Sequence, residues 1–315
     1  MARRTLFLLL GLLACAQAAR AELAGGHEVW IVSSRSLPGC SQAFNAERLS
    51  YSVFNGESFA PSDAGAFYGT LTPERPVCVL VHGSPATHGD LITYSLQIYP
   101  RILELLPENQ PVRLVFWSWP AARYHEKRIL KDMRRLADVS EAHGYYVAWF
   151  TDRIPPEIPV SLVGYSMGAR TTCTALQLLA TGRGPYCPYL ERQNPVRQAP
   201  LRVALLAAAI DRSSLYPGYR YGKALEPVDA ALVTTSRCDW ILKYYYFLGA
   251  LRQKKGPEAC GRFGVGSFGM LGAYRERYMQ IDVTYAVGES HDMNDYFNSV
   301  ELRPEFARVA LFSDR

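Results

Sequence analysis

The sequence predicts an α/β fold in which helices flank a mostly parallel central sheet. Short β-branched runs alternate with helical patterns from Val77 to the C-terminus, as expected for parallel strands joined by crossover helices. The 315 residues are 49% hydrophobic and 20% charged, which is an ordinary globular composition. Because no internal repeat or linker interrupts the pattern, we expect one domain over residues 19–315.

Six apolar runs predict the buried strands, and three longer periodic segments predict the helices between them. The strand runs are residues 77–81, 112–117, 160–163, 203–210, 231–235 and 281–287. Helices are expected over residues 90–106, about 127–153 and 167–180, each closely followed by a proline or glycine. Residues 29–33 and 49–54 alternate more strongly, which predicts an antiparallel edge on the N-terminal side of the sheet.

The N-terminus predicts export. Arg3 and Arg4 precede apolar residues 6–13, which are too few to span a bilayer, and small residues at positions 16 and 18 suit signal-peptide cleavage. We therefore expect residues 1–18 to be a signal peptide and the mature protein to be periplasmic or secreted. Two alternatives stay open: a lipobox-like segment at 12–15 that would anchor the protein through a lipid on Cys15, and a buried N-terminal helix. No later stretch of about 18 apolar residues predicts a transmembrane span.

The mild basic charge does not predict a nucleic-acid partner. Lys and Arg number 34 against 29 Asp and Glu, a net charge of +5. Without the two leader arginines the balance is 32 against 29, or about +3. The basic residues between Lys127 and Arg135 recur at helical spacing without interleaved aromatics, which is typical of a solvated helix face.

Six cysteines remain once a leader that contains Cys15 is removed. Cys78 lies in an apolar strand run and Cys173 in an apolar helix pattern, where a free thiol behaves as a small hydrophobic group. The loop candidates for one or two disulfides, whose pairing the sequence does not set, are Cys40, Cys187, Cys238 and Cys260. No CxxC or HxxxH spacing occurs, so we expect no metal site, and nothing predicts a cofactor.

A candidate nucleophile stands at a strand–turn–helix junction. Gly164-Tyr165-Ser166-Met167-Gly168 lies between the strand run 160–163 and the helical pattern that begins at Met167. A serine on so sharp a turn projects above the sheet edge, and the flanking glycines relieve crowding. The helix N-terminus supplies positive dipole for developing negative charge. The pattern predicts that Ser166 is a nucleophile, and a purely structural turn is the alternative.

The loop after the strand at 77–81 is expected to complete an oxyanion hole. His82-Gly83-Ser84 follows this strand, where acyl transfer requires a second backbone donor. We assign the two N–H donors to Ser84 and Met167. The imidazole of His82 is expected to be satisfied by the backbone and to take no part in catalysis.

We assign the general base and the acid that orients it from the order of the residues along the chain. His291 is the one histidine in the loop after the last predicted parallel strand, the others being at 27, 82, 88, 125 and 143. The acid is expected after the preceding strand, where Asp239 ends the segment 236–239. Asp211, which follows the strand run 203–210, stays open as an alternative acid. Asp292 is too close to His291 to face its ring.

These motifs resemble the α/β-hydrolase superfamily of serine hydrolases over roughly residues 70–300. The resemblance rests on His82-Gly83, the elbow at 164–168, Asp239 and His291. The segments 29–34, 117–120 and 236–239 are similar to a group of exported bacterial α/β hydrolases of unassigned substrate. The resemblance implies the α/β-hydrolase fold and an acyl-enzyme mechanism, but the fold by itself implies no substrate.

The leading interpretation is an exported carboxylic-ester hydrolase, esterase- or lipase-like, that acts on a small-molecule ester. Ser166 attacks, His291 transfers the proton and Asp239 holds the imidazolium. A serine peptidase is the nearest alternative, and it would need a charged pocket for a substrate terminus. A non-catalytic exported binding protein on the same scaffold is the alternative from another class. Acyl-chain length and oligomeric state stay open.

The substrate pocket is expected to include two aromatic residues, Tyr165 in the elbow and Trp240 beside the acid. Proteins of this fold usually carry their lid between the strand that here ends near residue 210 and the one that begins near residue 231. About 20 residues are too few for a multi-helix cap. We therefore expect no large cap domain.

Overall fold

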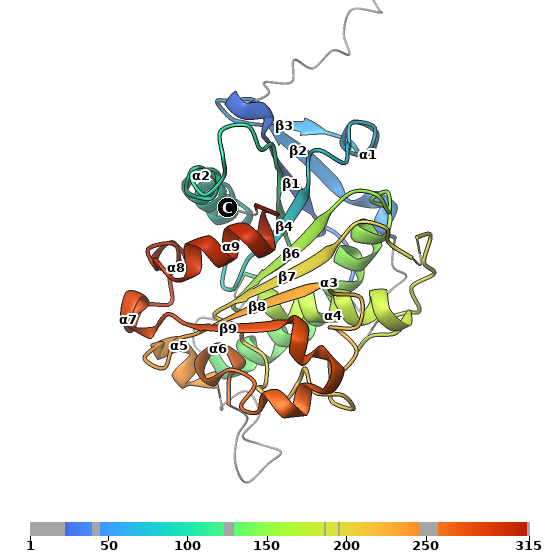
Figure 1. Cartoon of the computed structure of the whole chain (residues 1–315). Coiled ribbons are helices and arrows are strands. Elements are labelled where there is room, and N and C mark those ends of the chain that lie inside the picture. Colours follow the sequence, from blue (N-terminus) through green and yellow to red (C-terminus); the bar gives the residue numbers. More distant parts are fainter. Residues whose placement is uncertain are drawn as a thin grey trace, which may run out of the picture.

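The computed structural model describes residues 23–39, 45–122, 129–185, 187–194, 196–245 and 258–313. Over these residues a nine-stranded sheet has the order β3-β2-β1-β5-β4-β6-β7-β8-β9 (Figure 1). From β1 to β9 along this order, neighbouring strands run parallel, whereas β2 is antiparallel to both of its neighbours. The predicted α/β class with a mostly parallel central sheet is confirmed.

The central strands are buried on both faces. Every residue of β4 and β5 is buried, which explains why the sequence shows continuous apolar runs there and no alternation. The strands, in chain order, are β1 (Glu28–Ser33), β2 (Ser50–Phe54), β3 (Phe59–Ser62), β4 (Val77–Val81), β5 (Arg113–Ser118), β6 (Val160–Tyr165), β7 (Leu201–Leu206), β8 (Ala230–Thr235) and β9 (Tyr278–Asp282).

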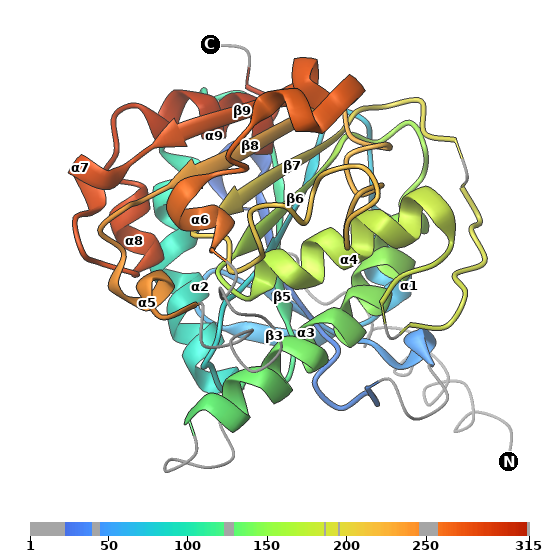
Figure 2. The same cartoon turned by 90° about the horizontal axis from the view of Figure 1, so that it is seen from below.

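Helices cover both faces of the sheet. Figures 1 and 2 show α2 (His88–Leu103) and α9 (Leu302–Ala310) on one face and α3 (Ile129–Asp152) and α4 (Gly168–Thr181) on the other. The remaining helical segments are short: α1 (Ala64–Tyr68), α5 (Trp240–Lys243), α6 (Cys260–Phe263), α7 (Thr284–Val287), α8 (Met293–Tyr296), and 3₁₀ segments at Ala24–Gly26, Ala46–Arg48 and Phe268–Arg277. None of the described helices is both long and apolar enough to cross a membrane.

Local signals set the ends of the long helices. Thr87 and Asp90 form a capping box that begins α2, because each side chain accepts from the other residue's backbone N–H. Helix α4 ends at Gly182, which adopts φ 70° and donates its N–H to the carbonyl of Leu178.

Three sequence expectations are corrected by the structure. The run 281–287 is not one strand: β9 ends at Asp282, whose side chain accepts the N–H of Thr284, and α7 follows. The run 203–210 is strand only to Leu206, because Ala207 has φ 47° and donates its N–H to Thr234 Oγ1. The predicted antiparallel pairing of β1 with β2 is present, but the edge strand is β3, and β1 lies between β2 and β5.

The strand order creates a crevice at the carboxyl ends of β4 and β6. The chain passes from β4 to β5 on one side and then crosses to β6 on the other side of β4. Ligand sites of open parallel sheets lie where the order reverses in this way. The carboxyl ends of these strands point towards α5, α7 and α8 (Figure 2).

Candidate active site

Ser166 lies on a strained turn between β6 and α4. Its φ is 53°, in the left-handed region that non-glycine residues rarely adopt. The two flanking glycines are required by close packing: a Cβ on Gly164 would lie 2.7 Å from Cα of Ala169, and one on Gly168 would collide with the carbonyl oxygen of Val81. The turn is therefore the strand–turn–helix junction that the sequence predicts.

His291 connects Ser166 with Asp239. Its Nε2 lies 2.9 Å from Oγ of Ser166, and its Nδ1 lies 2.6 Å from Oδ2 of Asp239. An ionised carboxylate can only accept hydrogen bonds, so Nδ1 carries the proton and Nε2 is left to accept the serine hydroxyl. The side chain of Asp239 is 0% exposed and that of His291 is 12% exposed. The structure thus brings the three predicted residues together in the order that proton transfer requires.

The carboxylate of Asp239 is fixed from two sides. Asp239 is the N-cap of α5, and its Oδ1 accepts the N–H of Leu242 at 2.9 Å. The hydroxyl of the buried Tyr296 lies 3.4 Å from Oδ2. The sequence does not predict this contact, because nothing in the local sequence places Tyr296 beside a residue 57 positions earlier.

The alternative acid, Asp211, belongs to a different network. Its Oδ1 accepts from the hydroxyl of Tyr245 at 2.8 Å, and that hydroxyl also accepts from Arg170 at 2.7 Å. Arg170 in turn pairs with the buried carboxylate of Glu141 at 2.8 Å. This network joins α3 and α4 to the segment after β7. It is Asp239, and not Asp211, that contacts His291.

The loop after β4 passes directly beside the nucleophile. A Cβ on Gly83 would lie 2.9 Å from Cβ of Ser166, so only glycine fits at this position. Within the described residues, neither the N–H of Ser84 nor that of Met167 donates to a backbone carbonyl. Of the two residues, Ser84 lines the cleft beside His291, whereas Met167 is buried at the start of α4. The ring of His82 is hydrogen-bonded to the carbonyl of Gly83 at 2.6 Å, as expected for a histidine satisfied by the backbone.

The other described histidines serve elsewhere. Burial lowers the pKa of His143 to about 3, and its Nδ1 lies 2.9 Å from Oγ of Ser34. His27 accepts the N–H of Val112, and His88 contacts Ser118. His125 lies outside the described residues. Among the described histidines, His291 alone contacts Ser166.

A cleft of about 570 Å³ adjoins the site: His291 and Ser84 line it, and the buried Ser166 lies behind them. Both predicted pocket residues line it: Tyr165, whose hydroxyl donates to the carbonyl of His291, and Trp240, which is 53% exposed. The acidic residues in its wall are Asp90 and Asp292, and no Lys or Arg of the described residues lines it. The cleft is therefore acidic. Trp117 and Trp119, by contrast, are buried in the core.

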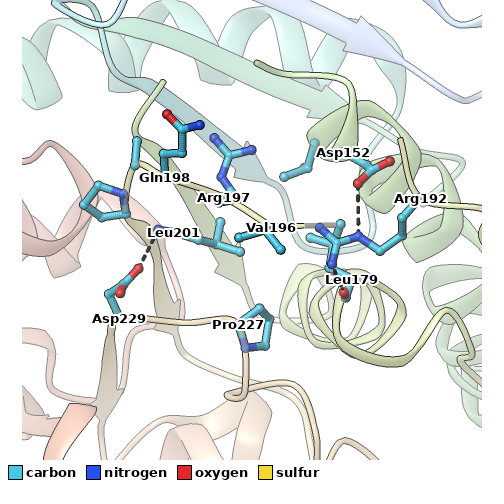
Figure 3. A pocket seen from close by; sticks show the side chains of 12 residues that line it. Asp152, Leu179, Arg192, Val196, Arg197, Gln198, Leu201, Pro227 and Asp229 are labelled. Atoms are coloured by element: carbon cyan, nitrogen blue, oxygen red, sulfur yellow. Dashed lines mark hydrogen bonds and ion pairs between the residues drawn. The ribbon is translucent and has the colours of Figure 1, made fainter. Parts of the chain in front are cut away.

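A second cavity, of about 340 Å³, lies at the opposite end of the sheet, where β7 begins (Figure 3). Arg192 is anchored there by Asp152 at 3.0 Å and by the carbonyl of Leu179 at 2.6 Å. Val196 and Pro227 complete part of the wall. No histidine, cysteine or serine of the described residues lines this cavity, so nothing there forms a nucleophile–base pair.

The described cysteines differ in burial, and the described residues offer no metal site. Cys78 and Cys173 are buried in β4 and α4, as predicted. Cys238 is exposed and Cys260 is buried, and both are free thiols, whereas Cys15 and Cys40 lie outside the described residues. The sulfur of Cys187 lies 3.5 Å from the carbonyl of Glu141. Over the described ranges, no group of three or more His, Cys, Asp or Glu side chains could hold a metal ion.

Comparisons with known proteins add little to this geometry. No protein-family model matches the chain, and no curated protein matches it. One similar solved structure is an acetylxylan esterase determined at 0.90 Å resolution. The likeness covers 76% of this chain and 96% of that chain, with 14% sequence identity and a TM-score of 0.33. A likeness this distant carries no argument about activity.

Proposed function

We propose that the protein is a serine hydrolase of the α/β-hydrolase type that cleaves carboxylic esters. The observation that carries the proposal is the single imidazole of His291 placed between the hydroxyl of Ser166 and the carboxylate of Asp239. In the proposed reaction the hydroxyl attacks the ester carbonyl while Nε2 of His291 takes its proton. The same proton then goes to the leaving alcohol. In the second half-reaction His291 takes a proton from water, the water oxygen attacks the acyl group, and the proton returns to Oγ of Ser166 as the acid is released.

The surrounding groups support this chemistry. The tetrahedral intermediate carries a negative oxygen, for which the N–H groups of Ser84 and Met167 and the N-terminus of α4 supply positive charge. Asp239 stabilises the imidazolium that forms during each half-reaction. A binding protein without catalytic function would have no need for the strained backbone at Ser166, which is costly unless the position of the hydroxyl matters.

Labelling with a fluorophosphonate tests the proposal. The probe is expected to modify Ser166 alone, and Ser166→Ala is expected to lose labelling and several orders of magnitude of ester turnover. Ser213→Ala serves as the control, because it is Ser166, and not Ser213, whose Oγ is hydrogen-bonded to Nε2 of His291. A panel of esters with increasing acyl length then gives the chain-length preference. Unchanged hydrolysis by the purified Ser166→Ala protein would contradict the mechanism.

One observation favours a second candidate, a serine peptidase that recognises a free amino terminus. Asp90 and Asp292 line the cleft, and hydrogen bonds from Thr87 hold the pKa of Asp90 below its usual range, so it is ionised at neutral pH. Two carboxylates and the exposed indole of Trp240 are the groups that attract an ammonium ion. Faster cleavage of leucine p-nitroanilide than of its N-acetyl derivative would support the peptidase; the reverse order would exclude it.

We also propose that the protein is exported, on the strength of the leader-like residues 1–18, which lie outside the described residues. Mass spectrometry of protein from the exporting host is expected to give a mature N-terminus at Ala19. A diacylglyceryl group on Cys15 would instead make it a lipid-anchored protein.

A further inference from the structure

Arg35 joins the ends of three strands next to the proposed oxyanion hole. It lies two residues after the end of β1, and its Nη2 donates to the carbonyl of Ala86 at 3.0 Å, in the loop after β4. Its Nε donates to Oγ of Ser118, the last residue of β5, at 2.6 Å. Arg35 does not line the cleft, so it acts from behind the loop that carries Ser84.

Arg35 also sets the hydrogen bonds of His82. Its Nη2 lies 3.4 Å from Nε2 of His82. Because a guanidinium can only donate, Nε2 must accept, so Nδ1 carries the proton and donates to the carbonyl of Gly83 at 2.6 Å. Burial lowers the pKa of His82 to about 3, which keeps the ring neutral and able to accept. The ring stacks on Trp119, whose Nε1–H donates to the carbonyl of His82 at 2.8 Å.

These contacts fix the loop on both sides of Ser84. Gly83 is held through His82 and Ala86 is held by Arg35, so the backbone between them has little freedom. We propose that Arg35 is a positioning residue that keeps the Ser84 N–H aimed at the developing oxyanion. The proposal rests on the proposed serine-hydrolase function. Oxyanion donors act only when they are pre-aligned with the transition state, so a small shift of the loop lowers turnover more than substrate binding.

The test uses Arg35→Met, which keeps the aliphatic stem and removes every donor. We expect kcat for a soluble ester to fall roughly 30-fold with KM within about 3-fold of the wild type. A trifluoromethyl ketone, which binds as an oxyanion adduct, should lose affinity by about the same factor as kcat/KM. Arg35→Lys keeps the positive charge but has a single donor nitrogen, so its kcat and its affinity for the ketone should lie between those of the wild type and Arg35→Met.

The matched control is Arg192→Met. Arg192 is also a half-buried arginine that donates to a backbone carbonyl, but it lies at the far cavity (Figure 3). We expect this variant to lose thermal stability while its kcat and ketone affinity stay unchanged. The proposal is overturned if Arg35→Met keeps wild-type affinity for the ketone. Should Arg35→Met not fold, wild-type ketone affinity in Arg35→Lys would overturn it. A wild type that neither hydrolyses esters nor reacts with fluorophosphonate would overturn the proposed function as well.

Discussion

The hydroxyl of Tyr296 and the imidazole of His291 share one oxygen, Oδ2 of Asp239. The distances are 3.4 Å from the hydroxyl and 2.6 Å from Nδ1. Tyr296 is fully buried, and burial together with the charge of Asp239 raises its pKa, so the hydroxyl stays protonated and donates. A second donor on the carboxylate weakens its attraction for the imidazolium. Tyr296 and His291 therefore compete for the same carboxylate oxygen.

Replacing Tyr296 with Phe is expected to move the acidic limb of the kcat/KM profile towards higher pH. Without the second donor, Asp239 attracts the protonated ring more strongly, so the acidic limb of the kcat/KM profile should move upwards by roughly 0.5 pH unit, or about 0.7 kcal/mol. Tyr146→Phe is the control, because Tyr146 is equally buried and donates to the carbonyl of Pro38, away from the site. An acidic limb that stays in place in Tyr296→Phe would show that the tyrosine only fills space.

The identity of the acid can be tested by comparing two conservative variants. Asp239→Asn keeps the shape of the side chain but favours the wrong tautomer of His291, so turnover should fall by roughly 10⁴-fold. Asp211→Asn can still accept from Tyr245, and it should lower turnover less than about 10-fold. Initial rates on one soluble ester check both. The reverse order would move the acid to the end of β7.

That the three candidate site residues lie close together could be predicted from local pattern and chain order. Ser166, Asp239 and His291 each follow a predicted strand, and the carboxyl ends of parallel strands meet at one edge of a sheet. Arg35 and Tyr296 carry no such signal. Their contacts with His82 and Asp239 span 47 and 57 positions and depend on how loops pack, which neither periodicity nor spacing encodes.

The same limit explains the errors in the fold. The β-branched residues at 281–287 satisfy a strand pattern, but the hydrogen bond from the Thr284 N–H to Asp282 ends the strand in three dimensions. Residues 207–210 are as buried as a strand, and their apolar character alone cannot show that Ala207 turns away from the ladder. Burial is visible in a sequence, whereas backbone direction often is not.

The Gly83→Ala variant tests whether the position of the loop after β4 matters for catalysis. The new Cβ would lie 2.9 Å from Cβ of Ser166 and 3.2 Å from the ring of Tyr165, so the loop with Ser84 must shift. We expect kcat to fall on the order of 100-fold, as when an oxyanion donor is lost. Gly89→Ala is the control, because its Cβ would meet only Oγ1 of Thr87, at 3.8 Å. Equal rates for the two variants would contradict the proposed place of this loop in catalysis.

The protein should lose stability as the pH falls below 6.5. Burial lowers the pKa of both His82 and His143 to about 3, whereas the ordinary value of 6.5 applies once the chain unfolds. Between pH 6.5 and 3 the unfolded state binds protons that the folded state does not, so the free energy of unfolding falls, by about 2 kcal/mol per histidine at pH 5. Urea unfolding at pH 7.5 and pH 5 measures this loss. His143→Gln should show a smaller loss than the wild type; an equal loss would assign the effect to other groups.

We expect the cleft to be open to dissolved substrate. The segment between β7 and β8, residues 207–229, contains turns and no helix, so it forms no helical cap. Trp240 and Ile241 of α5 form part of the wall, and they are held there by the N-cap Asp239. We therefore expect hydrolysis of a short-chain ester such as tributyrin to proceed below its solubility limit, with no jump in rate when an emulsion forms. Rates measured across that limit decide the matter. A steep rise above it, with little activity below, would show that a segment after Asp239 closes over the cleft, and Trp240→Ala should then weaken that rise.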